Sequence, residues 1–145
     1  MSILPISSAN KTEPTLADPS VRAVVLILAN NESNVIAATV TSVRQALDPQ
    51  DAVFVIADNC QDDTAHQAAA VGGIVFERQT GASDSKGAAI KWFVQKYWDQ
   101  LADYTLLVIL DADNLVPPDF MHAVKAGFSE QTVTQCLVLP SGYQG

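Results

Sequence analysis

Five short apolar runs, separated by segments with helical periodicity, constrain the fold of this chain more than any other feature. The runs are VRAVVLILA (21–29), AVFVIA (52–57), GIVFE (73–77), TLLVIL (105–110) and TQCLVLP (134–140). Most are rich in β-branched residues and lack the polar alternation of a strand with one wet face, which is typical of strands covered on both sides. The pattern therefore predicts a mostly parallel sheet.

The segments between these runs are predicted to be helices that cover the sheet. They span 33–47, 62–71, 85 to about 103, and a helix that begins at Pro117-Pro118 and carries Phe120, Val124 and Phe128. Strands that alternate with helices in this way predict a doubly wound α/β layer with helices on both faces of the sheet. Residues 1–19 contain three prolines and no periodicity, so we expect a flexible arm followed by one domain at 20–145.

The charge balance and the apolar runs limit the classes of partner. A net charge of −8, from 16 acidic and 8 basic residues, argues against nucleic acid, which needs clustered Lys and Arg. No run approaches the roughly 18 apolar residues of a membrane span, and no secretory signal is visible. Cys60 and Cys136 show no metal-binding spacing and read as free thiols. We expect a cytoplasmic location, or the cytoplasmic face of a membrane if the chain is part of a longer protein.

Two aspartates directly follow the fourth buried run, in the segment DADN. Asp111 and Asp113 are two positions apart, so in an extended segment both side chains project from the same side. Mg²⁺ and Mn²⁺ prefer oxygen ligands, and Mg²⁺ commonly binds through one or two carboxylates together with substrate phosphates. Ligands of doubly wound sheets bind beyond the carboxyl ends of the strands. The sequence therefore predicts that Asp111 and Asp113 hold Mg²⁺ or Mn²⁺, which bridges to a nucleoside diphosphate.

Other polar residues follow the neighbouring runs and are candidates for the same site. Asn31 and Glu32 follow the first run, and Glu32 can accept hydrogen bonds from a base or a ribose. Asp58 follows the second run, where the polar edge of a nucleotide can lie. Lys86 opens the third helix, where a diphosphate would suit both the lysine and the helix N-terminus. Asn31 is also explained as a turn residue.

Together these segments resemble the N-terminal, nucleotide-sugar-binding half of a family 2 glycosyltransferase with the Rossmann-like GT-A fold. The matching segments are LANNES (28–33), VIADNCQDDTA (55–65), ER (77–78), SKGAA (85–89) and VILDADN (108–114). The resemblance implies metal-dependent, inverting transfer from a nucleotide-sugar, most often a UDP-sugar, to an acceptor that the sequence does not identify. It implies that Glu32 and Asp58 contact the uracil and ribose and that Lys86 lies near the donor. Asp113 would be the principal metal ligand, with Asp111 reaching ribose or metal.

The chain also departs from the family pattern. Ser85 stands where the family has glycine, and the first loop lacks the usual proline. Family members continue beyond the point that corresponds to Gly145, and that part holds the general base and the acceptor site. We therefore expect an apparently truncated domain that is inactive alone, with unknown catalytic residues and an open status as an enzyme. Apolar surface left by a missing half would favour a homo-oligomer.

Three other classes fit parts of the pattern. A non-catalytic module that binds a nucleotide or a metal would keep the fold without the chemistry. A haloacid-dehalogenase-like phosphatase also places D-x-D after a buried strand, but it needs further lysine and acidic residues downstream. A nucleotidylyltransferase should carry a basic, glycine-rich loop after the first strand, and Asn30-Asn31-Glu32 is neither basic nor glycine-rich.

Overall fold

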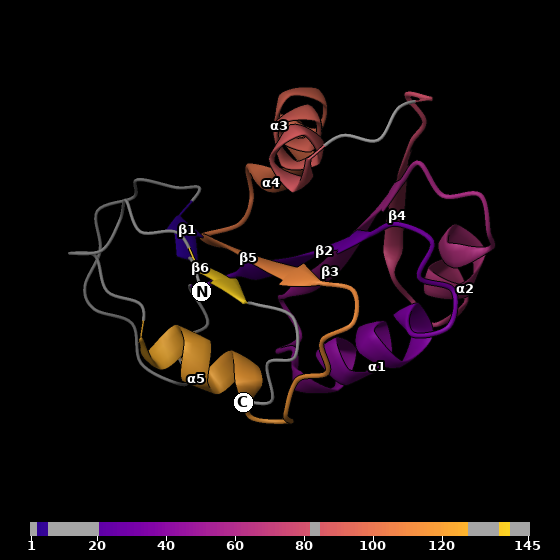
Figure 1. The fold of residues 1–145 in the computed structure, drawn as a ribbon. Coiled ribbons are helices and arrows are strands. Elements are labelled where there is room, and N and C mark those ends of the chain that lie inside the picture. Colours follow the sequence, from indigo (N-terminus) through magenta and orange to yellow (C-terminus); the bar gives the residue numbers. More distant parts are fainter. Residues whose placement is uncertain (1–2, 6–20, 82–84, 128–136, 140–145) are drawn as a thin grey trace.

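The computed structural model describes residues 3–5, 21–81, 85–127 and 137–139, which form one sheet with helices on both of its faces (Figure 1). The strands are β1 (Ile3–Pro5), β2 (Ala23–Ala29), β3 (Ala52–Asp58), β4 (Ile74–Arg78), β5 (Leu106–Asp111) and β6 (Leu137–Leu139). The helices are α1 (Ile36–Ala46), α2 (Thr64–Ala70), α3 (Lys86–Lys96), α4 (Trp98–Leu101) and α5 (Phe120–Ala126).

The sheet has the order β1-β5-β2-β3-β4 within these ranges, and β6 also pairs with β5. β2 through β6 pair in parallel, whereas β1 is antiparallel to β5. β1 and β6 lie along the same edge of β5, because β2 occupies its other edge. Leu4 of β1 lies opposite Leu107, and Val138 of β6 lies opposite Ile109. The predicted doubly wound, mostly parallel α/β fold is confirmed.

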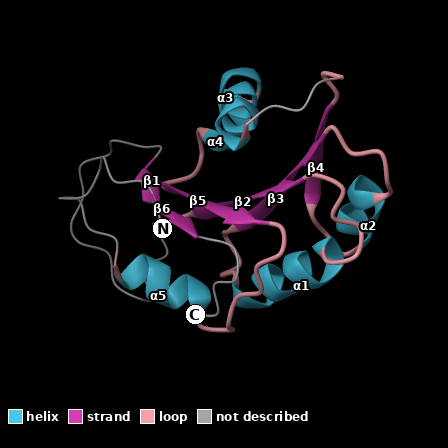
Figure 2. Ribbon diagram, in the orientation of Figure 1, coloured by secondary structure: helices cyan, strands magenta, loops and turns pink. Residues whose placement is uncertain are grey.

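Each of the two faces of the sheet has its own apolar core. α1, α2 and α5 cover one face, and α3 and α4 cover the other (Figure 2). Alternate residues of β2 serve the two cores: Val25 and Ile27 face α1, while Val24 and Leu26 face Phe93 of α3. This explains why the strand is apolar at every position, since no face of it meets water.

The direction of winding reverses between β2 and β5. From β2 the chain passes through β3 to β4 with α1 and α2 on one face, and then crosses the other face through α3 and α4 to reach β5. β5 therefore lies beside β2 on the side away from β3. This reversal of the strand order is a topological switch point, and in open α/β sheets ligands bind at such a point, beyond the carboxyl ends of the strands.

The third predicted helix is interrupted, which corrects the expectation of one helix over 85–103. Tyr97 leaves helical geometry (φ −120°, ψ 31°), and its ring packs on Phe76 and Phe93 at centroid distances of 4.6 and 5.3 Å. The break redirects the chain, so that Leu101 of α4 is buried while Trp98 stays 47% exposed. Trp98 is therefore not part of the core.

Other boundaries shift by a few residues. Residues 33–35 form a turn before α1, and α5 begins at Phe120 rather than at the prolines. Within the predicted arm the structure describes only Ile3–Pro5, which form β1, a strand that the sequence pattern did not predict. The rest of the arm, Phe128, and the predicted strand 134–140 outside β6 lie beyond the described residues. Among the helices that are described, none is long and apolar enough to cross a lipid bilayer.

Candidate functional site

A crevice opens over the carboxyl ends of β2, β3 and β5, at the switch point. Its polar lining consists of Asn30, Glu32, Asp58, Asn59, Lys86, Asp111 and Asp113. Five of the six residues predicted from the sequence are thus brought together. The exception is Asn31, whose side chain instead accepts a hydrogen bond from the backbone N–H of Gln61 at 2.7 Å.

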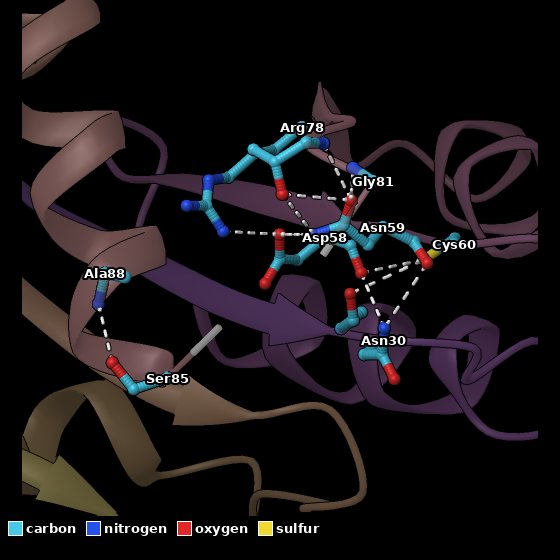
Figure 3. Close-up of polar contacts among 10 residues, drawn as sticks. Asn30, Asp58, Asn59, Cys60, Arg78, Gly81, Ser85 and Ala88 are labelled. Carbon is cyan, nitrogen blue, oxygen red and sulfur yellow. Dashed lines mark hydrogen bonds and ion pairs between the residues drawn. The ribbon is translucent and has the colours of Figure 1, made fainter. Parts of the chain in front are cut away.

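Lys86 and Asp111 form an ion pair across this crevice. The Nζ atom of Lys86 lies 2.6 Å from Oδ1 of Asp111, and the lysine side chain is 66% exposed. Lys86 is the first residue of α3, which Ser85 caps by accepting a hydrogen bond from the N–H of Ala88 at 3.1 Å (Figure 3). Because the lysine side chain reaches solvent, its ammonium group can turn from Asp111 towards a ligand, whereas the Asp111 side chain is only 13% exposed.

Asp111 and Asp113 lie on a tight turn at the end of β5. The N–H of Asn114 donates to the carbonyl oxygen of Asp111 at 3.2 Å and closes the turn. Asp111 is partly buried, whereas Asp113 is exposed. The turn therefore presents one carboxylate at the floor of the crevice and one at its mouth.

Carboxylates from two other loops lie near Glu32. Burial raises the pKa of the Glu32 carboxyl above its ordinary value of 4.5, and the negative charges of Asp113, Asp62 and Asp111 raise it further, while Lys86 lowers it. A bond from the Thr64 hydroxyl lowers the pKa of Asp62 to about 2, so Asp62 keeps its charge. The crevice is thus a place where a cation would relieve repulsion.

The donor set fits Mg²⁺ or Mn²⁺. No three His, Cys, Asp or Glu side chains within the described ranges form a group that could hold a metal without other ligands. Two carboxylates, one at the floor and one at the mouth of an open crevice, match the preference of Mg²⁺, which takes one or two carboxylates and completes its shell with water and phosphate oxygens. Their oxygen chemistry also suits these hard cations better than Cu or Zn.

Arg78 lies in the segment ER (77–78) that resembles the family, but no role in this site was predicted for it from the sequence. It is 6% exposed, and its Nη1 lies 3.0 Å from Oδ1 of Asp58 (Figure 3). The two residues are direct partners in the register of β3 and β4. That register was the missing information, because the sequence shows an arginine and an aspartate twenty positions apart without showing that they face each other.

Asn59 joins the same network and shapes its loop. Its backbone has a φ of 51°, which asparagine tolerates better than most residues. Its Nδ2 donates to Oδ1 of Asp58 at 3.1 Å, and its Oδ1 accepts from the N–H groups of Thr80 and Gly81 at 2.8 and 3.2 Å. Asp58 is therefore fixed at one oxygen from two sides.

The loops after β2 and β3 are also tied to each other. Nδ2 of Asn30 donates to the carbonyl oxygen of Asp58 at 2.7 Å, and the N–H of Glu32 donates to the buried hydroxyl of Thr64 at 2.9 Å. Asn31, at a φ of 52°, completes the tie through Gln61. These bonds fix the backbone that carries Glu32 and Asp58, so the crevice is largely formed before any ligand arrives.

The raised pKa of Glu32 predicts a pH-dependent stability. The folded state binds this proton more tightly than the unfolded chain, so stability is lost as the pH rises through the raised pKa. We expect Glu32→Gln to unfold at a higher temperature than the parent protein at neutral pH. The difference should disappear below the ordinary pKa of 4.5, where both states of the parent are protonated. Thermal melts across this range measure it.

The matched control is Glu77→Gln, which removes a carboxylate from an exposed position of β4. This control should not reproduce the pH-dependent gain. Equal melting temperatures of the parent protein and Glu32→Gln at neutral pH would contradict the prediction.

The fold and the crevice define a class, namely doubly wound α/β domains with an acidic ligand site at the switch point. The family model described as "Glycosyl transferase family 2" matches residues 24–141, and the chain therefore belongs to glycosyl transferase family 2. Comparison with curated protein sequences gives no match.

Solved structures share the fold. Glucosyl-3-phosphoglycerate synthase from Mycobacterium tuberculosis, in complex with Mg²⁺ and UDP, is 24% identical over 68% of this chain and 36% of that one, with a TM-score of 0.51. The same enzyme with Mn²⁺, UDP and glucosyl-3-phosphoglycerate is 22% identical over 76% and 42%, with a TM-score of 0.53. A mycobacterial protein is 21% identical over 77% and 40%, at 0.50. The chain thus spans 36–42% of the length of these proteins.

Proposed function

We propose that this chain binds a nucleotide-sugar donor, a UDP-sugar, for metal-dependent, inverting transfer of the sugar to an acceptor hydroxyl. The observation that carries the proposal is the crevice at the switch point, where Asp111, Asp113 and Lys86 converge from two elements. Membership of glycosyl transferase family 2 supports it. The presence of UDP with Mg²⁺ or Mn²⁺ in structures of similar fold is consistent with it.

The five residues of the crevice that were predicted from the sequence each have a task in this proposal. Asp113 and Asp111 hold the divalent ion, which when bound neutralises the charge that develops on the departing diphosphate. Lys86 exchanges its contact with Asp111 for the diphosphate, because the ion then supplies the positive charge that Asp111 needs. Asp58, held at one oxygen by Arg78 and Asn59, accepts an N–H of the uracil, and Glu32 accepts a ribose hydroxyl.

Inverting transfer requires a base that removes the proton of the attacking hydroxyl. The chain spans 36% and 42% of the two synthase chains above, and none of the crevice residues is assigned to that base. The donor half of the reaction is the part that this crevice can support.

Calorimetric titration of UDP into the protein tests the proposal. With Mn²⁺ present we expect saturable binding, and with a chelator we expect none, since two carboxylates repel a diphosphate unless an ion bridges them. UMP should bind more weakly than UDP by about tenfold or more, because it lacks the second phosphate that helps fill the metal shell. Equal binding of UDP with and without metal, or no binding in either, would contradict the proposal.

A second assay separates transfer from binding alone. Release of UDP from UDP-sugars, measured with candidate acceptors present, would show turnover. Metal-dependent binding of UDP with no release for any acceptor would favour a binding module on the same fold.

A further inference from the structure

We infer that Thr39 is a positioning residue that sets the direction of the two carboxylates from a helix outside the crevice. The inference rests on the proposed function, in which Asp111 and Asp113 hold a divalent ion. Thr39 lies on the buried stripe of α1, whose other members are Ile36, Val40, Val43 and Ala46. It is 1% exposed, and it is the polar exception on an otherwise apolar face.

The hydroxyl of Thr39 makes its shortest contact with the acidic turn. Its Oγ1 lies 2.5 Å from the carbonyl oxygen of Ala112 and 3.2 Å from that of Val35. A hydroxyl carries one proton, so it donates to one carbonyl at a time, and the shorter distance assigns the proton to Ala112. The contact joins two segments 73 positions apart in the chain.

Ala112 is the residue between the two carboxylates. Its carbonyl group belongs to the peptide unit that leads into Asp113, and a planar peptide turns as one body. Holding this oxygen therefore fixes the rotation of the peptide unit between Ala112 and Asp113. The turn bond from the N–H of Asn114 to the carbonyl oxygen of Asp111 restrains the backbone dihedral angles of Asp113, and the two contacts together set the direction of its side chain. Among the described residues no hydrogen-bond donor to the Asp113 carboxylate is seen, so the backbone is what orients it.

Bonds on either side complete the support of the turn. The N–H of Asn114 donates to the carbonyl oxygen of Asp111 at 3.2 Å. Farther along, the hydroxyl of Ser42, one helical turn after Thr39, accepts the N–H of Val116 at 3.2 Å. α1 thus holds residues 112–116 through two hydrogen bonds, and of these two the Thr39 bond is the one that lies between the carboxylates.

The test replaces Thr39 with valine, which keeps the branched shape and removes the hydroxyl. We expect the affinity for UDP in the presence of Mn²⁺ to fall about tenfold. This is the lower end of the loss seen when a residue that orients a metal ligand is replaced. Thr39→Ser, which keeps the hydroxyl, should restore most of that affinity. Ser42→Ala is the matched control, because it removes a bond to the same segment away from the carboxylates, and its affinity should stay close to that of the parent.

A measurement without ligand separates this inference from the proposed function. Hydrogen exchange at the amide of Asn114 should be faster in Thr39→Val than in the parent and in Thr39→Ser, because the turn loses its support. If the parent protein does not bind UDP, the proposed function fails, and the exchange rates still test the role of Thr39 in holding the turn.

Two results would overturn the inference. One is a lower melting temperature of Thr39→Val with unchanged UDP affinity and unchanged exchange at Asn114, since the hydroxyl would then serve only to satisfy a buried carbonyl. The other is a Thr39→Ser variant as impaired as Thr39→Val. If the valine variant does not fold, Thr39→Ala takes its place in the same comparison.

Discussion

Replacing Lys125 with methionine should lower the free energy of unfolding by about 3–5 kcal/mol, because it leaves buried carboxylate charge without its counter-ion. The side chain of Lys125 is 0% exposed, although it lies on α5 near the surface of the domain. Its Nζ contacts Oδ2 of Asp48 at 2.7 Å and both oxygens of Asp51, at 2.9 and 3.0 Å. The side chain of Asp51 is fully buried as well.

The loss of stability should extend beyond one ion pair, because Asp51 also accepts hydrogen bonds from two backbone N–H groups. Its Oδ1 accepts the N–H of Ala23 at 2.8 Å, and its Oδ2 accepts the N–H of Asp48 at 3.0 Å. Asp51 thus links α5 to the start of β2 and to the loop before β3. This network lies at the amino ends of the strands, whereas the crevice lies at their carboxyl ends, so the folded variant should retain UDP affinity.

Urea unfolding measures the effect, with Lys91→Met as the matched control at an exposed position of α3. The control should change stability by less than about 0.5 kcal/mol, as surface substitutions usually do. Adding Asp51→Asn to Lys125→Met should recover part of the loss, because the unpaired buried charge is then removed. A Lys125→Met variant as stable as the control would show that the buried pairing contributes nothing.

Replacing Asp113 with alanine should reduce Mn²⁺-dependent UDP affinity by about 100-fold or more. Replacing a residue that hydrogen-bonds a metal ligand already lowers metal affinity or activity by about 10–100-fold, and Asp113 is proposed as a ligand itself. Because Asp113 is exposed and makes no hydrogen bond within the described part of the chain, the melting temperature should change little. Titration of UDP with Mn²⁺, and melting of the same samples, measure the two quantities together.

Asp99→Ala serves as the charge-matched control, since it removes one negative charge at an exposed position of α4. It separates the loss of a ligand from a general change in net charge. Undiminished UDP affinity in Asp113→Ala would remove this residue from the proposed metal site. A large fall in the melting temperature of Asp113→Ala would instead mean that Asp113 stabilises the fold, which its exposed position does not predict.

The acidic pair was predictable from the sequence because its signal is local. A short, fully apolar run rich in β-branched residues is typical of a strand covered on both faces, and the residues directly after such parallel strands lie together at the carboxyl end of the sheet. Asp111, Asp58 and Glu32 each come after a run of that kind, so their meeting place was implied by the alternation of strands and helices. For Asn31 the same reasoning was less specific, since its side chain joins two loops while Asn30 lines the crevice.

The supporting residues had no comparable signal. Thr39, Arg78 and Lys125 are a threonine inside a helix, an arginine at the end of a strand and a lysine on a short helix, all ordinary on a protein surface. Each is buried because a particular partner faces it: the carbonyl of Ala112, the carboxylate of Asp58, or those of Asp48 and Asp51. These partners lie 20 to 77 positions away, and no periodicity relates them.

By itself, the sequence determined the alternation of strands and helices from β2 to β5, the doubly wound layer and the end of the sheet at which the acidic residues gather. These properties depend on the periodicity of apolar residues and on the need of buried backbone groups for hydrogen-bond partners. Both can be read from short stretches of sequence. The tertiary structure alone decided the break at Tyr97, the facing of Asp58 and Arg78, and the contact from Thr39 to the acidic turn. They depend on strand register and on the angle at which helices cross the sheet, which the packing of all the side chains sets together.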